Sequence, residues 1–142
     1  MSNPLVSHIG IAVEDLRAAV KQYSILLGRE PECVREVPDQ KVKVAIFPGG
    51  VSKESSISTR VELLTPISDD SPISRFLASR GEGMHHVCVY VDDIKAKLVE
   101  LKAAGFKLID ETPRIGAEGN RIAFVHPSGA HGVLLELEER AR

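Results

Sequence analysis

The sequence predicts an α+β fold in which two βαβββ modules pair into one curved mixed sheet around a metal site, with the helices on the outer face. The first observation behind this prediction is a repeat, because HIGIAVEDLRA at residues 8–18 recurs as HVCVYVDDIKA at residues 86–96. The second is that each copy leads into a helical pattern and then into three strand-like segments. One module alone offers too small an apolar face for a stable core, so we expect a single domain over residues 1–142.

Module one covers about residues 5–67. Alternation in residues 6–13 predicts a strand with Ile9, Ile11 and Val13 on one face. Asp15 is typical of a helix N-cap, and Gly28 suits the left-handed residue that ends a helix. Three strands are expected next, at residues 32–37, 41–47 and 57–64, with a surface loop at residues 48–58.

A connecting helix is predicted at about residues 71–81, with Ser71 as N-cap and Pro72 at its first position. Module two then covers about residues 83–139 and follows the plan of module one. MHHVCVYV is its first strand, Asp93 caps its helix and Gly105 ends it. The remaining strands are expected at residues 107–110, 121–125 and 132–137, with a loop at residues 114–120.

The composition is that of a soluble globular protein, with 43% hydrophobic and 27% charged residues. We expect neither a membrane span nor a signal peptide, since no run approaches the ~18 apolar residues that a span requires. The net charge of −2 gives no general attraction to nucleic acid. Two cysteines, Cys33 and Cys88, without an export signal predict a reducing, cytoplasmic location and no disulfide.

Each module places one histidine and one glutamate on the sheet face opposite its valine and leucine side chains: His8 and Glu62, then His86 and Glu136. Taken singly, each of these side chains is more often structural than a ligand. Their recurrence at equivalent places favours an N₂O₂ metal set for one Co²⁺, Zn²⁺, Ni²⁺ or Mn²⁺ ion per chain. The other histidines, His85, His126 and His131, are expected outside this set.

These stretches resemble the vicinal oxygen chelate superfamily and, within it, the methylmalonyl-CoA epimerases. The resemblance covers nearly the whole chain and is most specific in GMHH and in GNRIAFVHP followed by GVLLELE. It implies that His8, Glu62, His86 and Glu136 bind a divalent metal, most often cobalt. It also implies epimerisation of methylmalonyl-CoA at C2 by proton abstraction and return through an enolate, in a homodimer.

Glu136 is the candidate acid–base, and Lys43 stands where some family members carry a glutamate, which leaves the second base open. We expect Lys43 to face the cavity, as the apolar face of its strand is taken to be Val42, Val44 and Ile46. It would pair with the substrate carboxylate or act as a base. The CoA phosphates would be held by basic side chains, for which the candidates are Arg35, Lys107, Arg114 and Arg121.

Three alternative functions share this fold. A glyoxalase I-like lyase acting on a glutathione hemithioacetal would use the same metal set. A ring-cleaving dioxygenase would need iron on two histidines and one carboxylate, which four symmetric ligands argue against. A metal-free small-molecule binding protein would have no use for all four ligands.

Overall fold

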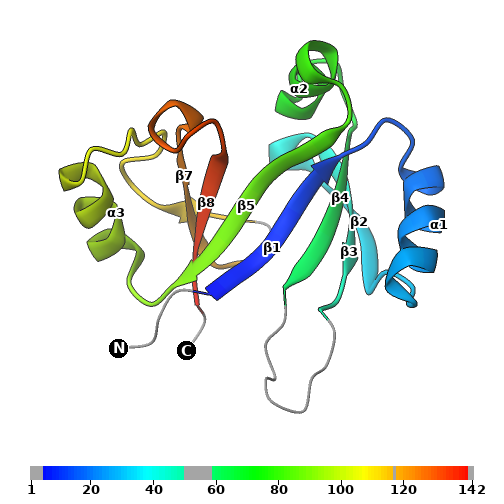
Figure 1. Cartoon of the computed structure of the whole chain (residues 1–142), viewed down its shortest axis with the longest axis horizontal. Coiled ribbons are helices and arrows are strands. Elements are labelled where there is room, and N and C mark those ends of the chain that lie inside the picture. Colours follow the sequence, from blue (N-terminus) through cyan, green and yellow to red (C-terminus); the bar gives the residue numbers. More distant parts are fainter. Residues whose placement is uncertain (1–4, 50–58, 117, 141–142) are drawn as a thin grey trace. The chain divides into compact units, whose positions relative to one another are not determined.

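The computed structural model describes residues 5–49, 59–116 and 118–140. In these residues it contains three α-helices and eight strands (Figure 1). The helices are α1 (Leu16–Leu27), α2 (Pro72–Arg80) and α3 (Ile94–Ala103). The strands are β1 (Leu5–Ala12), β2 (Cys33–Val37), β3 (Val42–Phe47), β4 (Arg60–Pro66), β5 (Gly83–Val91), β6 (Arg114–Ile115), β7 (Arg121–Val125) and β8 (Leu134–Glu139).

The contacts divide the chain into two compact units. The first unit is Ile9–His85, and the second unit combines Met1–His8 with His86–Arg142. Strand β1 therefore contributes its N-terminal half to the second unit and its C-terminal half to the first. The strand order is β2-β3-β4-β1 in the first unit and β1-β5-β8-β7-β6 in the second. The predicted α+β class and the two βαβββ modules are confirmed.

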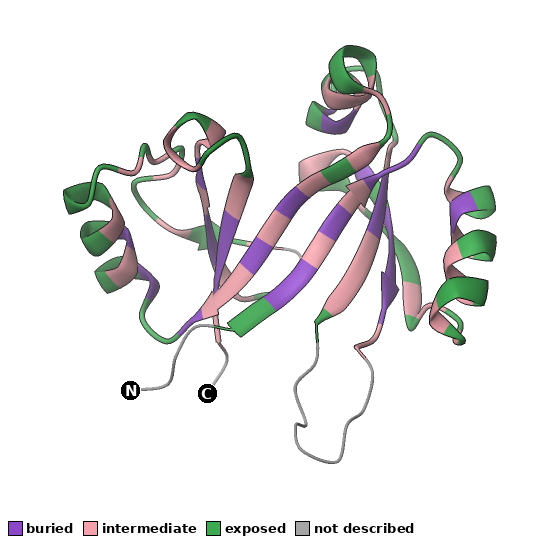
Figure 2. Cartoon of the chain, viewed as in Figure 1, coloured by how far each residue is buried: buried purple, intermediate pink, exposed green. Residues whose placement is uncertain are grey.

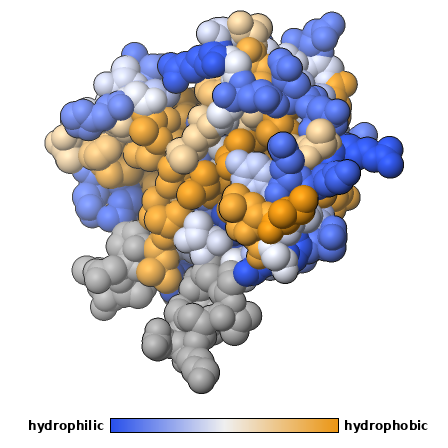
Figure 3. Space-filling view, turned by 45° about the vertical axis from the view of Figure 1, so that its right-hand side comes forward, coloured by the Kyte–Doolittle hydropathy of each residue, from blue (hydrophilic) through white to orange (hydrophobic). Residues whose placement is uncertain are grey.

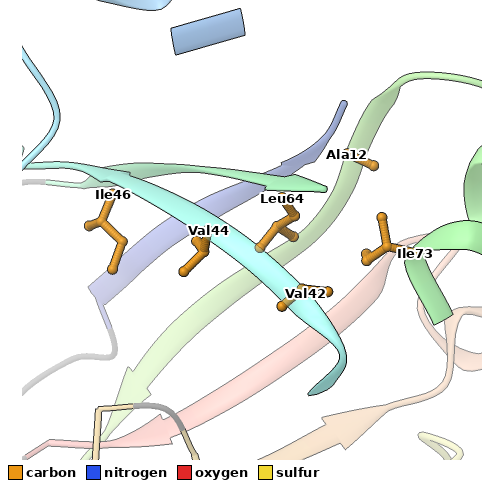
Figure 4. Close-up of a cluster of buried hydrophobic side chains, with 6 residues drawn as sticks. All are labelled: Ala12, Val42, Val44, Ile46, Leu64 and Ile73. Atoms are coloured by element: carbon orange, nitrogen blue, oxygen red, sulfur yellow. The ribbon is translucent and has the colours of Figure 1, made fainter. Parts of the chain in front are cut away.

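In the first unit, β3 pairs antiparallel with both β2 and β4. One face of these strands packs against α1 through a buried cluster that includes Ala45, Phe47 and Leu63. The opposite face carries Val42, Val44 and Leu64, which pack with Ile73 of α2 (Figure 4). Strand β3 is thus apolar on both faces, because helices cover both of them.

In the second unit, β8 pairs parallel with β5 and antiparallel with β7. Helix α3 packs on this sheet through Ile94 and Leu98, which meet Ala123 and Leu137. Every second side chain of β8 therefore points to α3, and those between point to the opposite face. Buried and half-buried residues alternate from His8 to Ala12 in β1 and from His86 to Val89 in β5 (Figure 2).

The predicted helix starts are confirmed at all three α-helices. The Asp15 carboxylate accepts a hydrogen bond from the Ala18 amide at 3.0 Å, and Asp93 accepts one from the Ala96 amide at 3.1 Å. Ser71 caps α2, with Pro72 at the first helical position as predicted. Gly28 ends α1 with a φ of 67°, a left-handed conformation that glycine adopts without strain.

Several predicted element bounds are wrong. The strand expected at residues 107–110 is reduced to one bridge between Leu108 and Val125. The loop expected at residues 114–120 contains β6, which pairs with β7. Strand β3 begins at Val42 rather than residue 41, because Lys41 ends a short 3₁₀ turn with a φ of 58°. Residues 50–58 of the predicted loop lie outside the described residues, and so do the first two of the strand expected at residues 57–64.

In the described part of the chain, no helix is both long and apolar enough to span a bilayer.

Candidate metal centre

Three of the four predicted ligands meet in the second unit: His8 from β1, His86 from β5 and Glu136 from β8. The Nε2 atoms of His8 and His86 lie 3.1 Å apart. Oε1 of Glu136 lies 3.4 Å from each of these nitrogens. All three residues are buried, with exposed fractions of 5%, 6% and 8%.

This triangle of atoms fits one divalent ion. Ligand atoms about 2.1 Å from an ion are about 3.0 Å apart at octahedral angles and about 3.4 Å apart at tetrahedral angles. The three observed separations of 3.1, 3.4 and 3.4 Å fall within that range. Two imidazole nitrogens and a carboxylate oxygen form a donor set that borderline divalent ions such as Co²⁺ and Zn²⁺ accept. The ligand types and their spacing therefore support a divalent metal site.

Strand alternation explains why these side chains share one face. In β5, Val91 packs into the core with α3, so His86 and Cys88 of opposite parity point away from that helix. In β8, Leu137 enters the same core, and Glu136 points to the opposite face. Cys88 and Glu136 are register partners on the parallel pair β5 and β8, which places His86 and Glu136 close together along the two strands.

A second buried carboxylate, Glu138, lies beside this set and was not predicted. Its exposed fraction is 3%, and its Oε1 accepts a hydrogen bond from the Ser7 hydroxyl at 3.2 Å. Its other oxygen, Oε2, accepts one from the Asn120 amide at 2.8 Å. Alternation along LLELEE puts Glu138 on the face of Glu136, so the signal was present in the sequence. It was missed because a strand that ends in several glutamates, as LLELEE does, is typically exposed to solvent there.

Glu62, the fourth predicted ligand, lies on β4 in the first unit. Its register partner on β3 is Ile46, which shares a face with Val44 away from α1. The predicted face of Glu62 is therefore correct. The carboxylate lies 3.8 Å from the Arg60 guanidinium. Its membership of the metal set stays a prediction.

The face predicted for Lys43 is wrong. Lys43 has the parity of Ala45 and Phe47, and both of these pack in the cluster under α1. Val42, Val44 and Ile46, which were expected to be the apolar face of this strand, occupy the other face of β3 and pack with Ile73 of α2. The face was assigned wrongly because both faces of VKVAIF carry buried apolar residues, so alternation does not show which face meets α1. Lys43 is exposed on the α1 face. Its predicted catalytic role assumed that it faces the cavity, and this orientation is not observed.

Two of the other histidines have local roles. His85 packs edge-on against Phe76 of α2 with ring centroids 4.9 Å apart, and burial lowers the pKa of its imidazole to about 4. Nδ1 of His126 accepts a hydrogen bond from the Ser128 amide at 3.0 Å, which caps a short 3₁₀ turn. Neither His85 nor His126 belongs to the group of His8, His86 and Glu136, which we call the metal triad.

An aromatic and a cation adjoin the metal triad. Phe124, the register partner of Glu136 on β7, meets His86 with ring centroids 6.4 Å apart. The Arg114 guanidinium carbon lies 5.3 Å from the centre of the Phe124 ring. The second unit thus brings a basic side chain to an aromatic ring that contacts the metal triad.

The fold and this buried donor set define a class of protein. The family model of the Glyoxalase/Bleomycin resistance protein/Dioxygenase superfamily matches residues 7–124, and the chain belongs to that superfamily. Within the superfamily, its similarity is to the methylmalonyl-CoA epimerases, as the resemblance in the sequence predicted.

Two curated relatives and one solved structure illustrate this similarity. The chain is 38% identical over 135 residues to the mitochondrial methylmalonyl-CoA epimerase of Bos taurus, covering 94% of this chain and 73% of the relative. It is 38% identical over 136 residues to the ethylmalonyl-CoA/methylmalonyl-CoA epimerase of Cereibacter sphaeroides, covering 94% and 96%. A methylmalonyl-CoA epimerase in complex with methylmalonyl-CoA and NH₄⁺ aligns with a TM-score of 0.87 at 34% identity, covering 99% and 96%.

Proposed function

We propose that this protein is a metal-dependent epimerase that inverts C2 of methylmalonyl-CoA. The observation that carries the proposal is the convergence of His8, His86 and Glu136 within 3.4 Å of one another in a buried site. The names of the relatives support the substrate, since two of them are epimerases of methylmalonyl-CoA. The complex of a similar epimerase with methylmalonyl-CoA supports an acyl-CoA ligand.

Epimerisation requires removal of the C2 proton and its return on the opposite face. We assign the removal to Glu136, because its Oε1 lies 3.4 Å from the Nε2 atoms of both histidines and it is the carboxylate of this group, a side chain that can take a proton. A divalent ion held by the triad would supply Lewis acidity toward the thioester oxygen. Burial of the site keeps water away from the carbanionic carbon while the proton is transferred.

The residue that returns the proton on the far side is left open. Lys43 has no place in this proposal, since it lies on the α1 face of β3. Arg114 is the cation that we assign to the anionic ligand, because its guanidinium lies over Phe124 beside the triad. Arg121 is a weaker candidate for the CoA phosphates, since its guanidinium is held by Glu139 at 2.7 Å and 3.0 Å.

The test is deuterium exchange at C2 of methylmalonyl-CoA in D₂O, followed by NMR. Glu136→Gln keeps an oxygen ligand and removes the base, so the exchange rate should fall by ~10²-fold or more while metal is retained. Glu139→Gln is the matched control, because it makes the same chemical change three residues further along β8 on the α3 side.

Exchange at the native rate in Glu136→Gln would contradict the acid–base role. A parallel assay with methylglyoxal and glutathione separates the epimerase from a glyoxalase I-like lyase. Elemental analysis of the native protein and of His86→Ala tests the metal site, and equal metal content in the two would refute it.

We further propose cobalt as the metal, a cytoplasmic location and a homodimer. Helix α1 carries two large apolar side chains at its surface, Ile25 at 77% and Leu26 at 73% exposure. Figure 3 shows apolar side chains among the polar ones at the surface. Sedimentation equilibrium of the native protein and of Leu26→Lys tests the dimer, and a native monomer would refute it.

A further inference from the structure

We propose that Glu138 is a positioning residue that acts through Ser7 on His8, so that the Nε2 lone pair of His8 points into the metal triad. The inference rests on the metal site of the proposed function. It assigns a role to a buried carboxylate that the proton transfer does not use. All the residues involved lie in the second unit.

The direction of the hydrogen bonds carries the argument. The Ser7 hydroxyl donates to Oε1 of Glu138 at 3.2 Å, and a hydroxyl has only one hydrogen to donate. In its contact of 3.1 Å with Nδ1 of His8, the Ser7 oxygen must therefore accept. It follows that Nδ1 of His8 carries the hydrogen and that Nε2 presents its lone pair. This is the atom that lies 3.1 Å from His86 and 3.4 Å from Glu136.

Glu138 is itself held in a fixed orientation. The Asn120 amide donates to Oε2 at 2.8 Å, while Ser7 donates to Oε1, so the two oxygens have separate donors. Asn120 lies in the turn between β6 and β7, where its carbonyl accepts a hydrogen bond from the Gly116 amide at 2.9 Å. A carboxylate that is 3% exposed costs free energy unless it is hydrogen-bonded, and these donors offset that cost.

Metal-ligating histidines usually donate their second ring nitrogen to an oxygen acceptor, which fixes the tautomer and the ring orientation. In this chain a buried hydroxyl is inserted between the imidazole and the carboxylate, with Ser7 only 1% exposed. The alternative is that Glu138 binds a metal directly, because His8, Cys88 and Glu138 also bring ligand atoms within 4.8 Å of one another. An ion bound there in addition to the one held by His8, His86 and Glu136 would give two ions per chain, whereas the positioning role predicts one.

The experiment is a titration of the chelator-treated protein with Co²⁺, monitored by calorimetry for affinity and stoichiometry. Glu138→Gln and Ser7→Ala should each weaken Co²⁺ binding by about 10–100-fold, at one ion per chain in the native protein. Glu139→Gln is the matched control and should bind Co²⁺ with native affinity, because its side chain faces Arg121 and the start of α3.

A second readout does not involve metal. Long-range ¹⁵N–¹H NMR of the metal-free protein, at a pH where the imidazole is neutral, reports which ring nitrogen of His8 carries the hydrogen. We expect protonated Nδ1 in the native protein and a mixture of tautomers in Ser7→Ala. A purely structural role of Ser7 would lower the thermal stability and leave the tautomer unchanged.

Native Co²⁺ affinity in both variants would overturn the positioning role and leave the proposed function standing. Two ions per chain in the native protein would overturn it in favour of direct ligation. Absence of Co²⁺ binding by the native protein would overturn the proposed metal site, and the positioning role with it.

Discussion

Binding of a divalent ion at the triad should raise the melting temperature by an amount that can be worked out. A ligand that binds only the folded state at 1,000 times its Kd stabilises that state by about 4 kcal/mol. The entropy of unfolding is about 2.1 cal/mol/K per residue, or about 0.3 kcal/mol/K for 142 residues. Dividing the first value by the second predicts a rise in melting temperature of about 13 °C.

The assay is scanning calorimetry of the chelator-treated protein with and without Co²⁺. His86→Ala should abolish most of the rise, because it removes one corner of a triangle whose edges are 3.1–3.4 Å. His131→Asn is the control for adventitious binding to histidine. His131 is exposed and has a φ of 56°, a left-handed conformation that asparagine tolerates.

A rise in His86→Ala equal to that in the native protein would refute the reasoning, since the ion would then bind elsewhere. The same measurement tests the prediction for Glu62. Glu62→Ala should reduce the rise if this carboxylate is a ligand, and the rise should be unchanged if the three ligands of the second unit suffice.

Three further predictions follow from local contacts. Lys43→Met should leave kcat and KM for methylmalonyl-CoA within about twofold of native, and a loss of ~10²-fold in kcat would restore its role as a base. The Lys41 ammonium, by its hydrogen bond to the carboxylate, lowers the pKa of Asp70 from 3.8 to about 2. The pair therefore contributes stability above pH 4, and this contribution is lost as the pH falls toward 2. Lys41→Met should return the Asp70 pKa toward 3.8 in an NMR titration. Asp15→Ala and Asp93→Ala should each lower the free energy of unfolding by about 1 kcal/mol in denaturant melts, because each removes an N-cap, and unchanged stability would argue against the caps.

Local signals in the sequence were sufficient for the helices. Asp15, Ser71 and Asp93 each cap the predicted helix, because capping depends on residues within one turn of one another. The faces of β1 and β5 were also predicted correctly, since only one face of each carries valine and isoleucine in an unbroken series. His8 and His86 followed from that alternation.

The errors arose where tertiary packing decides the outcome. Strand β3 is covered by helices on both faces, so its alternation cannot say which face meets α1, and Lys43 was assigned to the wrong one. Strand β6 was missed because its two residues form a strand only through pairing with β7. Alternation along β8 was sufficient to place Glu138 on the face of Glu136, but its burial depends on contacts with Ser7 and Asn120, which are distant in the sequence.

The candidate metal site combines residues from both segments of the second unit, the one that ends at His8 and the one that begins at His86. Module two supplies His86 and Glu136, while His8 comes from the start of module one on the half of β1 that belongs to the second unit. The contact of His8 with His86 joins residues 78 apart, and that of Ser7 with Glu138 joins residues 131 apart. Bringing together residues so far apart in the sequence costs conformational entropy, and folding of the chain compensates this cost before an ion binds. The affinity for the ion should therefore follow the folding of the second unit, and a substitution that loosens the β1–β5 pairing should weaken metal binding without touching a ligand.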